Sequence, residues 1–215
     1  MKGEFRSAAK RYSKWRSLYF YSRGKIALDP AYPEVARRLR ESPRPLMDLG
    51  CGMGLLAACL RAVGHRPAIT GMDIDRHKIQ LANTVLAGER TDFRVGSALD
   101  FPEHSGDVVM LDVLHYFEDG EQQRLLKKIA GSIAPGGVAF VRLTLNEPTW
   151  RFAMTRIEEQ LIAWSGWIPD PGHNFPTRDE LERPFIDAGL DVTLRPMWGV
   201  TPFNSYMLEA VRIKR

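Results

Sequence analysis

The sequence has 215 residues, of which 44% are hydrophobic and 26% are charged, and this is the composition of an ordinary globular protein. The length favours a single domain with a sizeable hydrophobic core, so neither disulfides nor a structural metal are needed to hold the fold. No apolar run approaches the ~20 residues of a membrane-spanning helix, and the first residues lack a signal-peptide pattern, so we expect a cytoplasmic protein. The two cysteines, Cys51 and Cys59, are too few for a disulfide framework and lack the spacing of a zinc site.

The net charge of +4 is divided unevenly along the chain. Residues 1–44 hold twelve Lys and Arg against four Asp and Glu, a charge of +8, whereas residues 45–215 carry −4. Such asymmetry favours an acidic partner or a membrane surface, which residues 1–25 would contact.

The basic segment is predicted to be helical. Apolar residues recur at helical spacing from Phe5 to Tyr19, which predicts a helix over positions 1–23. A second helix is predicted to open at Asp29-Pro30 and to end before Pro43, since Asp is a favoured N-cap residue and Pro suits the first helical position. We therefore expect an N-terminal helical cap over residues 1–44.

From residue 45 to residue 145, short apolar runs typical of buried strands alternate with segments typical of helices. The predicted strands are 46–49, 68–74, 93–95, 107–113 and 137–145. The predicted helices are 55–63, 76–87 and 118–133. This alternation predicts right-handed crossovers and an α/β fold with a doubly wound, mostly parallel sheet. Ligands of such sheets bind beyond the carboxyl ends of the strands, so the loops there are where chemistry is expected.

The last third of the sequence breaks the alternation. Residues 146–176 are rich in aromatic side chains and are predicted to form a helical lid insertion. A helix is predicted over 177–188, opened by a capping box of Thr177 and Glu180. Two strands, at 190–195 and 206–213, follow without a helix between them. We therefore expect a seven-stranded sheet that ends in an antiparallel strand pair.

Glycines alternate in the loop after the first predicted strand, residues 48–54 (DLGCGMG), so the backbone there can turn tightly and approach a ligand closely. The same loop satisfies a dinucleotide fingerprint, and Asp73 follows Gly52 at the separation along the chain that is typical of a ribose-binding acid. NAD is therefore one interpretation. Asp48 argues against NAD, because its carboxylate would repel the negatively charged pyrophosphate. The same carboxylate would suit a cationic ligand. The antiparallel tail also differs from the usual dinucleotide domain.

With these motifs in this order, residues 45–145 resemble the class I S-adenosylmethionine-dependent methyltransferases, and residues 177–213 resemble them in outline. The resemblance implies a methyltransferase domain over 45–215, S-adenosylmethionine as cofactor and no metal. The cofactor-binding residues that it implies are Asp48, Gly50, Cys51, Gly52, Gly54, Asp73, Ile74, Ser97, Ala98, Asp112 and Leu114. Ser97 stands where the family often has an Asp near the adenine amine, which leaves that contact open.

The acceptor is expected to be a small molecule, lipophilic or aromatic. The (Asn/Asp)-Pro-Pro-(Tyr/Phe) sequence of enzymes that methylate exocyclic amines of nucleobases is absent. The sequence also lacks a Pro-Cys pair after the fourth predicted strand, which a covalent cytosine mechanism would use, and an obvious acid cluster for a metal-dependent catechol reaction. His115 and Tyr116 follow the fourth predicted strand and are the candidates for a base or a positioning group, although His115 could equally be a structural histidine. The residues expected to line the acceptor site are Tyr19, Tyr21, Trp150, Trp164 and His173.

Two alternatives remain open at this point. The basic N-terminal segment would suit an RNA or protein methyltransferase, although nucleic acid is not the expected partner. The chain could also be a non-catalytic cofactor-binding protein that uses residues 1–25 as an interfacial helix at a membrane.

Overall fold

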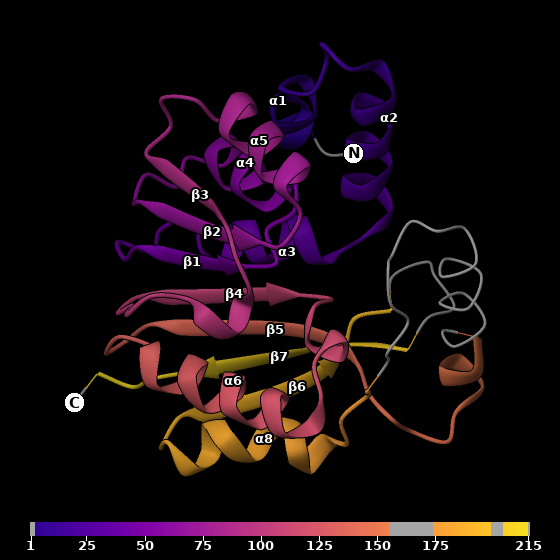
Figure 1. The fold of residues 1–215 in the computed structure, drawn as a ribbon, viewed down its shortest axis with the longest axis vertical. Helices are drawn as coiled ribbons and strands as arrows, with labels where there is room; N and C mark the ends of the chain where they lie inside the picture. The colour runs from indigo at the N-terminus through magenta and orange to yellow at the C-terminus, as the bar shows by residue number, and fades with distance from the viewer. Residues whose placement is uncertain (1–2, 155–173, 199–203, 215) are drawn as a thin grey trace. The chain divides into compact units, whose positions relative to one another are not determined.

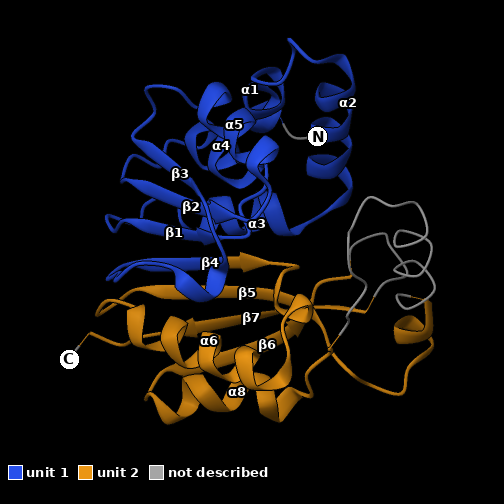
Figure 2. Ribbon diagram, in the orientation of Figure 1, with its two compact units in different colours: residues 1–109 blue, residues 110–215 orange. Residues whose placement is uncertain are grey.

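Seven strands form one sheet in the order β3-β2-β1-β4-β5-β7-β6 in the computed structural model (Figure 1). The structure describes residues 3–154, 174–198 and 204–214, and it divides into two units, residues 1–109 and 110–215 (Figure 2). The strands are β1 (Leu46–Leu49), β2 (Ile69–Asp73), β3 (Thr91–Val95), β4 (Asp107–Leu111), β5 (Val138–Thr144), β6 (Asp191–Pro196) and β7 (Ser205–Val211).

In the first unit, β1, β2 and β3 run parallel. Leu49 pairs with Met72, and Asp73 pairs with Val95, so the carboxyl ends of the three strands lie at one edge. The helices α4 (Leu55–Ala62) and α5 (Arg76–Val85) connect them. The side chain of Asp75 accepts hydrogen bonds from the backbone N–H groups of His77 and Lys78, which fixes the start of α5.

The N-terminal segment contains a short 3-10 helix (Gly3–Phe5) and three α-helices, α1 (Arg6–Lys10), α2 (Arg16–Leu28) and α3 (Ala31–Arg38). The prediction of a single helix over positions 1–23 is therefore wrong, because the chain leaves the helical path between α1 and α2. The second predicted helix is present as α3, although it begins one residue later than predicted, with Pro30 at the N-cap position; the Asp29 carboxylate accepts a hydrogen bond from the Ala31 backbone N–H. Both α1 and α3 pack against α4 (Figure 1).

In the second unit, β7 lies between β5 and β6 and runs antiparallel to both. Thr144 of β5 pairs with Ser205 at the start of β7, and Pro196 at the end of β6 pairs with Tyr206. The predicted α/β fold with a seven-stranded, mostly parallel sheet and an antiparallel ending is thus confirmed.

Two helices of this unit, α6 (Asp119–Ser132) and α8 (Arg178–Asp187), pack against each other. The predicted capping box of α8 is present, since Thr177 and Glu180 bond to each other's backbone N–H groups. Pro184 lies inside α8 and has no N–H to donate to the carbonyl of Glu180. That carbonyl instead accepts a hydrogen bond of 2.8 Å from the Gln123 side chain on α6.

The core follows the apolar runs of the sequence. Val108, Val109 and Met110 of β4 are completely buried, and the residues that open α4, 55–60, are buried as well. Among the helices of the described ranges, none has the length and hydrophobicity needed to cross a bilayer.

Candidate functional site

The loop between β1 and α4 takes a backbone path that favours glycine. Gly50, Gly52 and Gly54 have φ angles of 75°, 54° and 79°, in the left-handed region that other residues rarely adopt. The backbone N–H groups of Gly50 and Cys51 both donate to the carbonyl of Met72, at 2.7 and 3.0 Å. The predicted glycine loop is thus fastened to the carboxyl end of β2. We refer to residues 50–54 as the glycine loop.

Asp73 ends β2 and joins the glycine loop to the start of α5. One of its carboxylate oxygens accepts a hydrogen bond of 2.8 Å from the Gly52 N–H, and the other accepts one of 2.9 Å from the Asp75 N–H. Each oxygen retains a lone pair for another donor, such as a ligand hydroxyl. The next residue, Ile74, leaves 75% of its surface exposed. An acceptor for hydroxyl groups therefore stands beside an open apolar side chain.

Asp48 on β1 is a buried carboxyl group, 3% exposed, and its Oδ2 atom has no hydrogen-bond partner among the described residues. Burial and the nearby charge of Asp73 raise its pKa to about 7. A buried acceptor without a donor is costly, so the position is suited to a ligand that brings a donor or a positive charge.

Asp48 should make the stability of the protein depend on pH. In the folded chain the Asp48 carboxyl stays protonated up to about pH 7, whereas in the unfolded chain it loses its proton near its ordinary pKa of 3.8. The free energy of unfolding should therefore fall as the pH rises from 4 to 7, by up to about 4 kcal/mol. Urea unfolding at pH 5 and pH 7 measures this fall, and in Asp48→Asn the difference between the two pH values should shrink. The same pH dependence in both proteins would contradict this account.

The loop after β3, which contains Ser97 and Ala98, is bonded to Asp73 through the residue before them, Gly96. The Gly96 N–H donates to the backbone carbonyl of Asp73 at 3.0 Å. The Ser97 hydroxyl accepts a hydrogen bond of 3.2 Å from the Leu99 N–H and so caps a short 3-10 helix, Ala98–Asp100. Ala98 is buried. The Ser97 side chain thus has a local structural role, and its contact with an adenine amine remains a prediction.

The two cysteines are buried and unpaired. Burial raises the pKa of both thiols, that of Cys59 to about 12 and that of Cys51 further. Because the nucleophile is the thiolate, neither side chain is prepared for covalent catalysis. Cys51 instead packs on β2, where a Cβ at Gly71 would lie 2.8 Å from its sulfur.

In the second unit, Asp112 follows β4 with a φ of 58°, unusual for a residue other than glycine. Its carboxylate accepts a hydrogen bond of 3.0 Å from the guanidinium of Arg142, and its N–H donates to the Arg142 carbonyl. Arg142 also donates to the Ser205 hydroxyl at 3.3 Å and is almost fully buried. Arg142 was not predicted from the sequence, although an arginine inside an apolar strand is a signal of a buried partner. Leu114, two positions beyond Asp112, is completely buried.

His115 and Tyr116 lie in a 3-10 helix, Leu114–Tyr116, and differ in exposure. His115 is 7% exposed, and its ring lies 4.2 Å from that of Tyr116 and 5.8 Å from that of Phe175. Tyr116 is 42% exposed. The backbone carbonyl of His115 accepts a hydrogen bond from the Asn174 N–H at 3.1 Å, so the chain before α8 is tied to this turn.

The residues predicted to line the acceptor site lie in both units. Tyr19 and Tyr21 are on α2, where Tyr19 is half-buried beside the Arg23 guanidinium and Tyr21 is 47% exposed. Trp150 is 64% exposed. Trp164 and His173 lie outside the described residues.

Arg151 makes cation–π contacts with both Trp150 and Trp198. The guanidinium of Arg151 lies 4.7 Å from the Trp150 ring and 4.4 Å from the Trp198 ring. The exposed Trp150 ring is thus one face of this cluster, and its contact with an acceptor remains a prediction.

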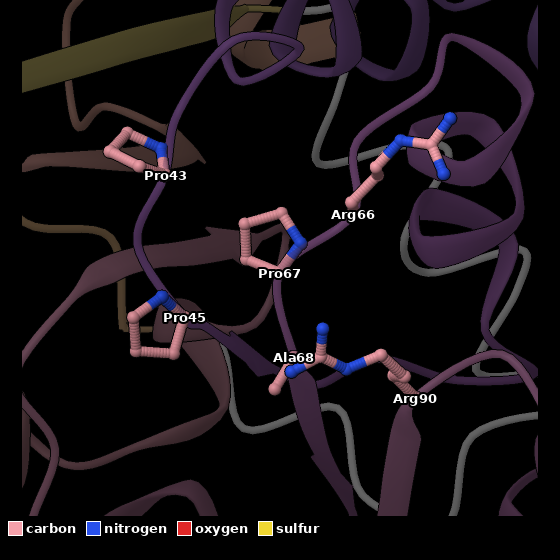
Figure 3. A pocket seen from close by; sticks show the side chains of 6 residues that line it. All are labelled: Pro43, Pro45, Arg66, Pro67, Ala68 and Arg90. Atoms are coloured by element: carbon pink, nitrogen blue, oxygen red, sulfur yellow. The ribbon is translucent and has the colours of Figure 1, made fainter.

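A hollow of about 330 Å³ lies at the amino ends of the first unit's strands, opposite the carboxyl ends that carry the glycine loop and Asp73. Its lining residues precede β1, β2 and β3, and they are Pro43, Pro45, Arg66, Pro67, Ala68 and Arg90 (Figure 3). A second hollow, of about 300 Å³, shares Pro43, Arg66 and Pro67 with it. Both are at the amino ends of the strands, away from the glycine loop, and so neither is the predicted cofactor site. Within residues 3–154, 174–198 and 204–214, no group of three or more His, Cys, Asp or Glu side chains could hold a metal ion.

The chain is similar to curated bacterial methyltransferases. It is 29% identical over 171 residues to a ubiquinone biosynthesis O-methyltransferase of Rhizobium etli, covering 74% of this chain and 66% of that protein. It is 32% identical over 146 residues to a trans-aconitate 2-methyltransferase of Methylobacterium radiotolerans, covering 66% of this chain and 54% of the relative. The chain thus spans less than two thirds of the length of both relatives.

Solved structures share its fold. The mitomycin 7-O-methyltransferase structure superposes with a TM-score of 0.67 and 19% identity over 97% of this chain and 60% of that one. A magnesium protoporphyrin IX methyltransferase from Synechocystis, solved with bound S-adenosylhomocysteine, gives a TM-score of 0.64 and 18% identity over 87% of this chain and 82% of that one.

A family model described as a methyltransferase domain matches residues 23–194, most of the chain. It spans the glycine loop, Asp73 and the strands from β1 into β6, which is the region that carries the sequence resemblance. The chain therefore belongs to the methyltransferase domain family, within the class I S-adenosylmethionine-dependent superfamily.

Proposed function

We propose that the protein transfers a methyl group from S-adenosylmethionine to a small-molecule acceptor. The observation that carries the proposal is the pair of carboxyl groups beside the glycine loop, Asp48 with an unbonded buried oxygen and Asp73 bonded to Gly52. Family membership and the names of the relatives support it.

The residues of the first unit fit this cofactor. The Asp73 oxygens can accept hydrogen bonds from ribose hydroxyls, and the exposed Ile74 side chain offers an apolar surface to an adenine ring. The buried Asp48 carboxyl offers an acceptor to the cationic methionine portion, and a positive charge there would favour its ionised form. The glycine loop leaves open space at Gly52, where a Cβ would meet no atom within 4 Å.

The chemistry asked of the protein is modest. S-adenosylmethionine, when bound, supplies a methyl group already activated by the positive sulfonium. What the chain must do is hold the acceptor in line and exclude water, and positioning of this kind can account for much of the rate. A base is needed only if the acceptor loses a proton. For that role we propose His115 or Tyr116, of which Tyr116 is the more exposed.

A titration with S-adenosylhomocysteine by calorimetry tests the cofactor, with NAD as the competing ligand. We expect micromolar binding of S-adenosylhomocysteine, in the range of about 1–100 μM, and no measurable heat from NAD. Binding of NAD alone would overturn the proposal in favour of a dinucleotide-binding domain.

We propose that the acceptor is lipophilic or aromatic. Both relatives are named for small molecules, but only the ubiquinone biosynthesis relative points to an aromatic acceptor, since trans-aconitate is a polar acid. The exposed rings of Trp150 and of Tyr21 provide aromatic surface in the two units. Transfer of a radiolabelled methyl group into fractionated extract of the source organism identifies the acceptor, and label found only in RNA or protein would contradict a small-molecule acceptor.

We propose that the protein is cytoplasmic and associates with a membrane surface. Of the residues in α2 only Ser22 and Ile26 are buried, while Phe20 and Leu28 are more than half exposed. Arg16 and Arg23 lie over the rings of Phe20 and Tyr19 at 6.0 and 5.5 Å. A helix with exposed aromatic and basic side chains suits the interface of an anionic bilayer.

Vesicles containing phosphatidylglycerol should therefore sediment the protein at low salt. Replacing Phe20 and Tyr21 by Ser should reduce the bound fraction about threefold or more, because both exposed rings are lost. High salt should release the unmodified protein, since it screens the basic side chains. Ile213→Ser, at an equally exposed apolar position in the other unit, is the control and should bind like the unmodified chain. An equal loss in both variants would contradict a role for α2.

A further inference from the structure

Tyr12 connects the N-terminal helices to the glycine loop. It lies between α1 and α2, and its side chain is completely buried. Its hydroxyl group donates a hydrogen bond of 3.0 Å to the backbone carbonyl of Met53, inside the glycine loop. A side chain from outside the methyltransferase core thus bonds directly to the loop proposed to hold the cofactor.

The bonded carbonyl belongs to a peptide that could otherwise turn. Met53 stands between Gly52 and Gly54, and glycine accepts positive and negative φ angles with similar ease. The Met53–Gly54 peptide is fixed at both ends, since its carbonyl accepts from Tyr12 and its N–H donates to the Cys51 carbonyl at 3.0 Å. Without the Tyr12 bond, this peptide would keep the hydrogen bond from its N–H to the Cys51 carbonyl, and its carbonyl would have lost the donor that fixes its direction.

Tyr12 is itself held firmly. The helix that precedes it, α1, packs against α4, and the neighbouring Arg11 forms an ion pair of 2.7 Å with Glu89. Burial raises the pKa of the Tyr12 phenol well above its usual range, so the hydroxyl remains a donor at any physiological pH. The loop carbonyl therefore bonds to a rigid partner.

We infer that Tyr12 is a positioning residue of the cofactor site, which holds the Met53–Gly54 peptide in the orientation that binds the cofactor. The Tyr12 hydroxyl then contributes to cofactor affinity, and by linkage cofactor binding strengthens the bond between Tyr12 and the Met53 carbonyl. The inference rests on the proposed function, because it takes the glycine loop as the place where S-adenosylmethionine binds.

Tyr12→Phe tests it, since the ring stays and only the hydroxyl is lost. The dissociation constant for S-adenosylhomocysteine should rise about three- to tenfold, as expected for a carbonyl deprived of its buried donor. Phe5→Leu is the matched control, because Phe5 is buried in the same segment and leaves the loop bond in place. It should lower the melting temperature without changing that dissociation constant.

Amide hydrogen exchange supplies the readout that a general loss of stability would not produce. In Tyr12→Phe, peptides covering residues 50–55 should exchange faster than in the unmodified chain, and in Phe5→Leu they should not. The inference would be overturned if Tyr12→Phe bound S-adenosylhomocysteine and exchanged its amides like the unmodified chain. It would also be overturned if both variants lost the same affinity for S-adenosylhomocysteine. If the unmodified chain itself fails to bind S-adenosylhomocysteine, the proposed function fails, and the exchange of residues 50–55 without ligand still decides whether Tyr12 holds the loop.

Discussion

Replacing Asp73 by Ala should weaken S-adenosylhomocysteine binding about 100-fold, or about 2.7 kcal/mol. Two effects combine in this loss. The carboxylate is the group proposed to accept the ribose hydroxyls, and hydrogen bonds to charged groups are the stronger ones. It also holds the Gly52 N–H at 2.8 Å and the Asp75 N–H at 2.9 Å, so the glycine loop and the start of α5 lose a common anchor. Calorimetric titration measures the affinity directly.

Two further variants separate these effects. Asp73→Asn keeps one oxygen acceptor and should lose only about tenfold in affinity. Asp92→Ala removes a carboxylate from the neighbouring strand, where it pairs with Arg94 on an exposed surface, and should bind normally. An Asp73→Ala protein that is folded and binds as tightly as Asp92→Ala would show that Asp73 does not contact the ligand.

Replacing Asp112 by Val should destabilise the fold by about 4 kcal/mol, because two costs add. The Arg142 guanidinium, whose side chain is 8% exposed, would lose its carboxylate partner; because the Asp112 side chain is 39% exposed, this loss should cost about 3 kcal/mol, the low end for a buried pair. Val would also have to adopt a φ of 58°, which should cost it about 1 kcal/mol more than Asp, a residue type that tolerates this region better. Urea unfolding gives the change in free energy.

The controls for this variant vary one feature at a time. Asp112→Asn keeps an oxygen acceptor for Arg142 and a residue type that tolerates the left-handed region, and removes only the negative charge, so it should lose less stability. Asp92→Val removes an aspartate from an exposed pair with Arg94, in a strand where valine is favoured, and should change stability little. Equal stability of Asp112→Val and Asp92→Val would show that the Arg142 pair does not stabilise the protein.

The glycine loop and Asp73 could be located from the sequence because they belong to adjacent parallel strands. Asp48 lies near the end of β1 and Asp73 lies at the end of β2, and parallel pairing brings the carboxyl ends of these strands together. The two apolar runs at 190–195 and 206–213, between which the sequence shows no helical pattern, likewise predicted the antiparallel ending.

Contacts between distant residues were the part that the sequence did not show. Helical spacing over positions 1–23 fitted one continuous helix, yet the chain breaks there and the buried Tyr12 reaches Met53, 41 positions away. Periodicity records which face of a helix is apolar and contains nothing about a hydroxyl's partner. Asp112 was predicted as a cofactor contact, but its pairing with Arg142, 30 positions away, depends on how the strands are aligned.

The proline inside α8 specifies where α6 docks on it. A carbonyl in the middle of a helix normally bonds to the N–H four residues on, which leaves little for a side chain of a neighbouring helix. Because Pro184 has no N–H, the Glu180 carbonyl stays open, and the Gln123 amide meets it at 2.8 Å. A slip of one residue along either helix would separate the amide from this carbonyl. A residue that weakens an isolated helix thus defines a single alignment of the pair.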